Sequence, residues 1–476
     1  MRDDTTAILN ALRQAVGDDH VLTEASEVRA AALDGRGRRQ GDALAVVRPA
    51  STSETAAVMR VARDFDLAVV AQGGNTSNVG GSTPEPGLPP DEVRRTIILQ
   101  TSRMRRILAI DPVNNTVTVE AGVVLEKIQE AALAVDRLFP LSLAAEGSAV
   151  AGGVIASNAG GVHVLRYGMA RRMVLGLKVV LASGEVLDLM RSLRKDNAGY
   201  ALKEIFVGSE GTLGIVTEAV LALEPLPQRQ LSAWVTLADI RSVDTLFARL
   251  EARFGPALTA FELIGRSPLA SLADVTGLTP PIPTEDWQVL LDVSVWQADD
   301  EETPERLEML LGDLIEEGVL TNGAVSQSDS DREAFWRCRE TIPSAVKRQG
   351  GNVKHDISVP RSALAAFIVD TFAALRAAFP GVEPSVFGHY GDGNLHFNVG
   401  PGPVAFPHEE AIHRLVHDRV IAAHGSIAAE HGVGSLKTDE LVRTKAPEEI
   451  AAMRALKRAF DPDNRLNPGR IVRLEE

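Results

Sequence analysis

The sequence predicts an α+β protein of more than one domain, and three observations lead to that class. The chain has 476 residues, which is too many for one ordinary domain and suits two or three. Its first half alternates short Val- and Ile-rich runs with helical patterns. A later stretch shows the order strand, helix, strand, strand, helix, strand, which is the ferredoxin-like order.

The elements of the first half follow from the spacing of its apolar residues. Short apolar runs predict strands at residues 44–47, 67–71, 96–99, 116–121 and 174–181. Helical spacing predicts helices at residues 52–64 and 125–135. Residues 80–91 are rich in proline and glycine, which predicts a flexible loop without helix or sheet.

The sequence Glu-Pro-Leu-Pro at residues 224–227 predicts a domain boundary. The ferredoxin-like elements beyond it are expected at residues 231–237, 243–254, 259–263, 288–295, 304–317 and 323–326. Longer helices are expected at residues 332–348, 361–379, 409–424 and 448–460. We therefore expect a first domain at residues 1–225, a second at residues 226–425, and a C-terminal segment at residues 426–476 that returns to the first domain.

Composition excludes several classes of function. Apolar residues make up 45% of the chain and charged residues 24%, which argues against disorder. The formal charge of −15 argues against a general nucleic-acid-binding surface. The single cysteine, Cys338, rules out an intrachain disulfide and Cys-rich metal sites. Because neither a signal peptide nor a membrane span is recognisable, we expect a cytoplasmic protein, with peripheral docking to the inner membrane left open.

Three glycine-rich segments point to a bound phosphate group. The first, residues 73–82, follows an apolar strand and contains four glycines and five small polar residues. Without Cβ atoms, backbone N–H groups can converge closely on an anion. The segment is neither GxGxxG nor GxxxxGK[ST], so Rossmann and P-loop sites are disfavoured, while a plain glycine-rich turn is the alternative. Because residues 146–161 and 207–216 are similarly rich in glycine, we expect one large phosphate-bearing cofactor.

A β-hairpin at residues 387–398 is the strongest candidate for a metal site. A four-residue loop would place His389 directly opposite His396, with Cβ atoms about 4.5–5.5 Å apart. Two imidazoles held in this way can chelate one metal ion, and a hydrogen-bonded histidine pair is the alternative. Glu430 and His431 could supply a third ligand and a base, because neighbouring residues of an extended segment point in opposite directions.

A second histidine pattern competes with the hairpin. His413 and His417 are four residues apart on one expected helix, but Arg414 replaces the Glu of the HExxH zinc-protease pattern. Because acidic and basic residues surround them, we interpret these two histidines as part of a solvated helix face. His355 carries no pattern that indicates a role.

The glycine-rich segments, together with Asn467-Pro468-Gly469-Arg470, resemble the FAD-binding domain of the vanillyl-alcohol oxidase/p-cresol methylhydroxylase flavoproteins. The resemblance implies a two-part FAD-binding domain of that type plus a ferredoxin-like, antiparallel-sheet substrate domain with added helices. The first loop has no histidine to which flavin could be attached, so noncovalent FAD is expected. The residues implied to bind FAD are Gly73, Gly74, Asn75, Thr76, Ser77, Asn78, Ser82, Gly147, Ser148, Gly152, Gly153, Ser157, Asn158, Gly161, Gly211, Ile215, Val216 and Asn467.

The motifs GHYGDGNLHFN and AEHGVGSLK, with residues 192–200, are similar to those of the FAD-dependent D-2-hydroxy acid dehydrogenases. This group includes D-2-hydroxyglutarate dehydrogenase and bacterial D-lactate dehydrogenase. The resemblance implies a zinc or manganese site and a catalytic base. The implied roles are metal binding for His389, His396 and Glu430, base for His431, and substrate binding for Arg339, Lys354 and Asn398.

We expect oxidation of a D-2-hydroxy acid to the 2-oxo acid, with the proton passing to His431 and the hydride to flavin N5. D-2-hydroxyglutarate is the first choice. Pro343 stands where the 2-hydroxyglutarate enzymes tend to have threonine, which keeps D-lactate, D-malate and glycolate as alternatives. A metal-dependent hydrolase and a noncatalytic flavin protein are the competing interpretations. We also expect a homodimer and an external electron acceptor such as electron-transfer flavoprotein, a quinone or a cytochrome.

Overall fold

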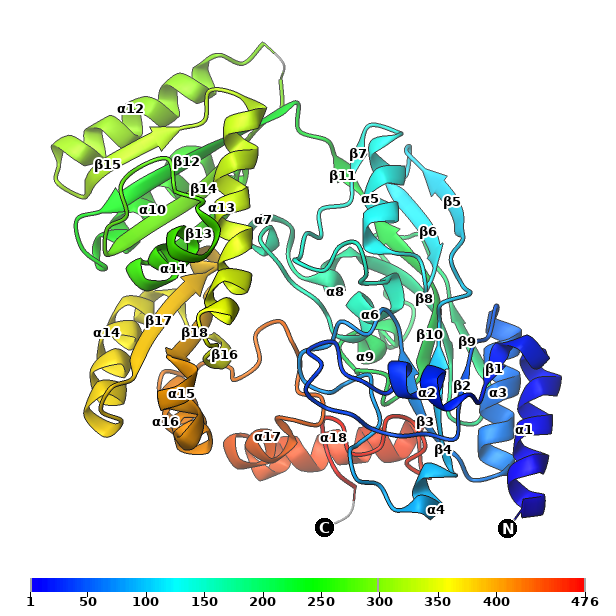
Figure 1. Cartoon of the computed structure of the whole chain (residues 1–476). Helices are drawn as coiled ribbons and strands as arrows, with labels where there is room; N and C mark the ends of the chain where they lie inside the picture. Colours follow the sequence, from blue (N-terminus) through cyan, green and yellow to red (C-terminus); the bar gives the residue numbers. More distant parts are fainter. Residues whose placement is uncertain (1, 298, 475–476) are drawn as a thin grey trace. The chain divides into compact units, whose positions relative to one another are not determined.

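A computed structural model gives the fold of the chain and describes residues 2–297 and 299–474 (Figure 1). The chain divides into two compact units. The first unit comprises Met1–Ala159, Met169–Pro225 and Glu430–Glu476, and the second comprises Gly160–Gly168 and Leu226–Ala429. No helix within the described residues is long and apolar enough to cross a bilayer.

The first unit begins with a four-stranded sheet in the order β1-β2-β4-β3. Its strands are β1 (Val21–Leu22), β2 (Ala45–Val47), β3 (Ala68–Gln72) and β4 (Thr96–Gln100). Helices α1 (Arg2–Val16) and α3 (Thr52–Asp64) contribute Ile8, Leu12 and Met59 to the hydrophobic core of this sheet. Because β2 and β3 both run parallel to β4, the carboxyl ends of these three strands share one edge.

A five-stranded antiparallel sheet completes the framework of the first unit, in the order β5-β6-β10-β8-β9. Its strands are β5 (Ile107–Asp111), β6 (Thr116–Glu120), β8 (Val174–Val180), β9 (Val186–Leu189) and β10 (Ile215–Ala222). β7 (Arg137–Leu138) and β11 (Glu224–Pro225) form a separate pair. The helices of this part are α2 (Ala25–Ala31), α4 (Pro90–Val93), α5 (Leu125–Leu133), α6 (Ala151–Ala156), α8 (Ala170–Met173), α9 (Lys203–Phe206), α17 (Thr438–Thr444) and α18 (Pro447–Phe460).

The second unit is built on a seven-stranded antiparallel sheet in the order β15-β12-β14-β13-β17-β18-β16. Its strands are β12 (Arg229–Leu237), β13 (Leu258–Gly265), β14 (Trp287–Val295), β15 (Leu320–Val325), β16 (Val353–Ser358), β17 (Glu383–Gly388) and β18 (Asn394–Gly400). The first four strands in sequence have the spatial order 4-1-3-2, with α10 (Ser242–Phe254) after the first and α12 (Glu302–Glu316) before the fourth, which confirms the predicted ferredoxin-like arrangement. A further helix, α11 (Arg266–Thr276), lies between the second and third of these strands.

Helices cover both faces of this sheet. One face packs against α10 (Ser242–Phe254), α12 (Glu302–Glu316), α14 (Arg361–Ala378) and α16 (Glu409–Ala422). The other face packs against α11 (Arg266–Thr276) and α13 (Asp329–Arg348). The short helices α7 (Val164–Tyr167) and α15 (Gly402–Ala405) complete the unit. Alternate residues of each strand therefore meet different helices.

The sequence predicts most of these elements, and the differences have local causes. The helix expected at residues 52–64 has those bounds, since Ser51 caps it by accepting a hydrogen bond from the Glu54 N–H. The loop expected at residues 80–91 contains the start of α4, because proline is tolerated at the first position of a helix. Helix α11 is missing from the sequence prediction, as are the edge strand β16 and the widening of the sheet to seven strands.

Candidate functional site

The first glycine-rich loop follows β3 at the edge where the parallel strands end. A Cβ atom on Gly74 would lie 1.8 Å from the carbonyl oxygen of Ser148, so only glycine allows this loop to approach the second glycine-rich segment. A Cβ on Gly73 would lie 2.6 Å from Val150 Cγ2 in the same segment. The structure thus brings together the first two segments that the sequence singled out.

The backbone of this loop has the properties of an anion site. The N–H groups of residues 73–78 donate to no carbonyl or side chain within the part of the chain that the structure describes. The loop is held instead by its side chains: Ser77 Oγ accepts from the Gly81 N–H at 3.1 Å, and Ser82 Oγ donates to Asn75 Oδ1 at 2.9 Å. A hollow of about 320 Å³ is lined by Gly73, Gly74 and Asn75 together with Gln72 and Gln100. N–H groups at the carboxyl edge of parallel strands suit a phosphate group.

Asn467 joins the first and third glycine-rich segments. Its Oδ1 accepts from the Ala71 N–H at 2.9 Å, and its Nδ2 donates to the Glu210 carbonyl at 2.6 Å. Asn467 is only 1% exposed. This side chain is engaged with protein backbone, so it fixes the loops relative to each other within the first unit.

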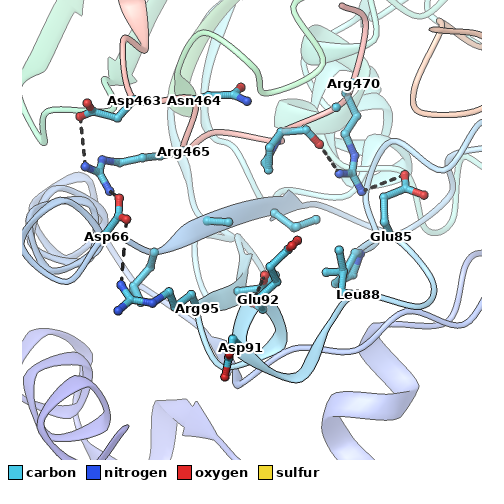
Figure 2. A pocket seen from close by; sticks show the side chains of 17 residues that line it. Asp66, Glu85, Leu88, Asp91, Glu92, Arg95, Asp463, Asn464, Arg465 and Arg470 are labelled. Atoms are coloured by element: carbon cyan, nitrogen blue, oxygen red, sulfur yellow. Dashed lines mark hydrogen bonds and ion pairs between the residues drawn. The ribbon is translucent and has the colours of Figure 1, made fainter. Parts of the chain in front are cut away.

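A larger hollow of about 450 Å³ lies elsewhere in the first unit and is shown in Figure 2. None of residues 73–82 lines it. Its Arg465 pairs with Asp66 at 2.7 Å and with Asp463 at 3.1 Å, and its Arg470 lies 3.8 Å from Glu85 (Figure 2). Because carboxylates already neutralise these guanidinium groups, the size of this hollow does not make it the phosphate site.

The loop that carries Glu430 and His431 is fastened to the third glycine-rich segment. Glu210 accepts hydrogen bonds from the N–H groups of Val433 and Gly434, at 2.8 and 2.7 Å. Burial raises the pKa of the Glu210 carboxyl, and these two hydrogen bonds partly oppose that effect. Gly434 has a φ of +53°, and a Cβ there would lie 2.1 Å from the Val79 carbonyl oxygen. The glycines after His431 therefore let this loop lie against the first one.

The second unit holds the histidine hairpin, with a register that differs from the prediction. β17 and β18 pair Phe387, and not His389, with His396. A 3₁₀ turn at Tyr390–Asp392 lengthens the connection, so the expectation of a four-residue loop with His389 directly opposite His396 is wrong. The two imidazoles still lie close, with ring centroids 5.5 Å apart.

A buried carboxylate, Glu262 of β13, organises this hairpin. Glu262 is fully buried and contacts His389 Nδ1 with one carboxylate oxygen. Its other oxygen accepts from Arg339 Nε at 2.7 Å and lies 2.6 Å from Arg339 Nη2. Burial by itself would raise the pKa of the Glu262 carboxyl, but the charges of Arg339 and His389 outweigh it and lower that pKa to about 2. An ionised Glu262 favours a proton on His389 Nδ1, so in its neutral form His389 can offer only Nε2 as a metal ligand.

Polar residues line the face of β16 and β18 that His396 shares. Lys354 lies directly opposite Asn398, and Asp356 lies directly opposite His396. Directly opposed residues of antiparallel strands point to the same face, as do residues two apart on one strand. Arg339 reaches this face from α13, with its guanidinium carbon 4.9 Å from the centroid of the Phe387 ring. The structure therefore gathers His389, His396, Arg339, Lys354 and Asn398 within the second unit.

The other expected site residues are divided between the two units. Glu430, His431 and Asn467 lie in the first unit with most of the expected FAD-binding residues, whereas Gly161 lies in the second unit. The sequence did not indicate Glu262 or Glu210. Glu262 is a charged residue within the mostly apolar run Leu258–Gly265. This placement is the sequence signal that could have identified it as a site residue.

Comparisons with known proteins agree with this geometry. Residues 226–471 match the family model described as FAD linked oxidases, C-terminal domain, and residues 43–190 match the one described as FAD binding domain. The chain is 35% identical to D-2-hydroxyglutarate dehydrogenase of Xanthomonas citri pv. viticola, over 98% of this chain and 97% of that protein. It is 35% identical to mitochondrial D-2-hydroxyglutarate dehydrogenase of Bos taurus, over 98% and 83% of the two chains. A D-2-hydroxyglutarate–pyruvate transhydrogenase of Saccharomyces cerevisiae is 30% identical, over 97% and 93%.

Solved structures share the fold at lower sequence identity. p-Cresol methylhydroxylase with substrate bound aligns with a TM-score of 0.78 and 16% identity, over 100% of this chain and 98% of that one. 4-Ethylphenol oxidase from Gulosibacter chungangensis aligns with a TM-score of 0.74 and 18% identity, over 100% and 98%. These similarities confirm the predicted fold, and the match of residues 43–190 identifies its first part as an FAD-binding domain that accompanies the antiparallel-sheet domain.

Proposed function

Because the chain belongs to the family of FAD-linked oxidases and is therefore an FAD-dependent oxidoreductase, we propose that it oxidises a D-2-hydroxy acid to the 2-oxo acid. D-2-hydroxyglutarate is the first choice, since relatives that bear this name are 35% identical over 98% of the chain. The observation that carries the proposal is the face of the second unit that combines Arg339, Lys354 and Asn398 with two histidines. A carboxylate needs such cations, and a hydroxyl group needs a base and a Lewis acid.

FAD fits the first unit because the N–H groups of residues 73–78 and the glycine contacts provide a backbone cradle for its pyrophosphate. We assign it to the residues that the sequence indicated, from Gly73 to Ser82, in residues 147–161, and at Gly211, Ile215 and Val216. The residues at the cradle include no histidine, so binding is noncovalent. When bound, FAD accepts the hydride from the substrate carbon.

We assign the metal, zinc or manganese, to His389, His396 and Glu430. The donor set of two imidazoles and a carboxylate suits either ion. Support comes from the Ala429 N–H, which donates at 3.4 Å to the carbonyl of Asp356, the residue opposite His396. Glu430 follows Ala429 directly in the chain. When bound, the cation supplies charge that favours loss of the hydroxyl proton.

The protein side chains have distinct tasks in this proposal. His431 accepts the hydroxyl proton as general base. Lys354 and Arg339 bind the substrate carboxylate groups; Glu262 occupies the Nε and Nη2 groups of Arg339, so the Nη1 group serves the substrate. Asn398 orients the hydroxy acid from its place opposite Lys354. Glu262 keeps both His389 and Arg339 in position.

Pro343 favours a second candidate, a smaller substrate such as D-lactate, D-malate or glycolate. This proline lies inside α13, four residues after Arg339. It has no hydroxyl group with which to bind a distal carboxylate. The choice between a five-carbon diacid and a smaller acid therefore depends on this region of the second unit.

Anaerobic reduction of the bound flavin tests the proposal. The yellow protein is mixed with the D and L forms of 2-hydroxyglutarate, lactate and malate, and with glycolate, while flavin absorbance is followed. We expect bleaching by one or more D-2-hydroxy acids and slower or no bleaching by the L forms. A protein that binds FAD but is bleached by none of these acids would refute the proposed function.

The electron acceptor, assembly and location complete the proposal. Reoxidation requires an external acceptor, such as electron-transfer flavoprotein, a quinone or a cytochrome. The yeast relative is named a D-2-hydroxyglutarate–pyruvate transhydrogenase, which adds a 2-oxo acid to these choices. We propose a homodimer in the cytoplasm. Steady-state rates with each acceptor test the choice of acceptor, and light scattering of the purified protein tests the dimer.

A further inference from the structure

Three histidines of the second unit meet on the face of the sheet opposite to His396. His355 lies on β16, and His413 and His417 lie one turn apart on α16. One ring nitrogen from each lies within 4.8 Å of the other two. His355 and His417 are each 3% exposed, and His413 is half-buried. The interpretation of His413 and His417 as a solvated helix face is therefore wrong for His417.

The strand register explains why this cluster is separate from the hairpin site. His355 is directly opposite Phe397, whereas His396 is directly opposite Asp356. Because neighbouring residues of a strand point to opposite faces, His355 and His396 lie on different sides of the same two strands. The cluster faces α16, and the hairpin site faces α13.

Hydrogen bonding directs the ring nitrogens toward one another. The Phe397 carbonyl oxygen lies 3.0 Å from His355 Nδ1, and a carbonyl can only accept, so the proton is on Nδ1 and the lone pair on Nε2. This Nε2 lies 2.9 Å from His413 Nδ1. The other nitrogen of His413 lies 3.7 Å from Glu409 Oε1. A metal-bound histidine typically gives its second N–H to a carbonyl or a carboxylate, and both partners are present here.

We propose that His355, His413 and His417 form a second metal site that takes a divalent cation of the zinc type. Neutral imidazole suits zinc, copper and nickel, whereas magnesium and calcium prefer oxygen ligands. Two nitrogens on one tetrahedral zinc are about 3.3 Å apart, given Zn–N bonds of about 2.0–2.1 Å, so the observed 2.9 Å requires little adjustment. The ring of His417 lies with its centroid 5.6 Å from that of His355 and 5.7 Å from that of His413, so all three rings adjoin one another.

The cation fastens α16 to β16. β16 is an edge strand that is hydrogen-bonded to β18 alone among the strands of the sheet, and it carries Lys354. Its position therefore depends on what packs behind it. A cation held by all three histidines would therefore fix the position of the strand that carries Lys354.

Zinc stoichiometry of the FAD-loaded, full-length protein tests the proposal. Chelator-treated protein is equilibrated with zinc alone, dialysed, and analysed for bound metal and flavin. We expect two zinc ions per chain in the parent and one in His413→Gln, a change at a half-buried helical position that glutamine tolerates. His408→Gln, at an exposed histidine just before the same helix, is the matched control and should keep two.

Variants that remove a ligand of the hairpin site distinguish zinc at that site from zinc at the three histidines. His396→Gln removes a ligand of the hairpin site, so it should bind one zinc, and the double variant His396→Gln/His413→Gln should bind none. Flavin content equal to that of the parent shows that each variant is folded. The second site is refuted if His413→Gln binds as much zinc as the parent, or if His396→Gln alone abolishes binding. Unchanged zinc in His396→Gln would instead refute the hairpin metal and leave the second site standing.

Discussion

The two units of the molecule prepare their binding groups by opposite means. The first unit removes side chains: Gly74 lies so close to the Ser148 carbonyl that a Cβ would be 1.8 Å from it, and the N–H groups of residues 73–78 remain for a ligand. The second unit instead buries charged side chains and neutralises them with one another, as Glu262 does with Arg339 and His389. A site made of backbone N–H groups (a backbone site) is disrupted when side-chain atoms are added. A site made of paired charges (a charge site) is disrupted when one of the partners is removed.

Gly74→Ala tests the backbone site and should have the largest effect. The added Cβ forces the loop away from residues 147–153, so we expect loss of most bound flavin and with it the activity. Overpacking of this kind costs about 1–3 kcal/mol or more. The measurement is flavin absorbance per chain in the purified protein. Gly312→Ala is the control, because a Cβ at this helical glycine meets nothing within 4 Å; equal flavin content in both variants would contradict the model of a close backbone cradle.

His431→Asn removes the proposed general base but keeps the backbone hydrogen bonds that hold its loop. Loss of a general base typically lowers kcat by about 10²- to 10⁴-fold. Bound flavin should stay at the parent level, since Glu210 holds this loop through the N–H groups of Val433 and Gly434. His424→Asn, at an exposed histidine, is the control and should keep the parent rate. Normal turnover by His431→Asn would place the base elsewhere.

Glu262→Gln tests the charge site. Removing one partner of a buried ion pair costs about 3–5 kcal/mol, and loss of a group that orients a metal ligand lowers metal affinity about 10- to 100-fold. We expect a lower Tm together with weaker zinc binding. Asp292→Asn is a matched control, because Asp292 is also fully buried and pairs with Arg332 at 2.8 Å outside the hairpin. Asp292→Asn should lower the Tm but leave zinc binding unchanged. If both variants lose zinc to a similar extent, Glu262 stabilises the fold without a specific effect on the metal site.

The contrast between backbone sites and charge sites also explains which features could be predicted from the sequence. Glycine-rich loops are recognisable because function depends on composition within a short stretch, as in residues 73–82. The ferredoxin-like order is recognisable because hydrophobic periodicity is local. Glu262 was missed because its partners are 77 and 127 residues away, and the His355 cluster was missed because it joins a strand to a distant helix. The hairpin register was wrong because a single 3₁₀ turn changes which residues are opposed.

The pH dependence of stability provides a quantitative test of the charge site. The Glu262 carboxyl has its pKa lowered from 4.5 to about 2 in the folded protein, so its ionisation stabilises the fold by about 3 kcal/mol. That contribution is complete above pH 4.5 and is lost as the pH falls toward 2. The Tm difference between the parent and Glu262→Gln, measured in chelator, should therefore be largest near pH 6 and shrink below pH 4.5. A difference that stays constant down to pH 3 would show that the ionised carboxylate is not what stabilises the parent.

Pro343 offers the smallest and most selective change. A proline inside α13 cannot donate to the carbonyl of Arg339, four residues earlier, and so it weakens the helix at the residue that binds Glu262. Pro343→Thr restores the N–H and adds a hydroxyl group, whereas Pro343→Val restores the N–H alone with a similar shape. Both variants should raise the Tm by the same helical repair.

Only the threonine should change selectivity. One hydrogen bond of about 1 kcal/mol corresponds to about a fivefold gain in kcat/KM for D-2-hydroxyglutarate relative to D-lactate. If threonine and valine shift the ratio equally, the helix and not the hydroxyl sets substrate choice. If neither shifts it, the distal carboxylate is bound by other residues, and Pro343 gives no reason to prefer a smaller acid.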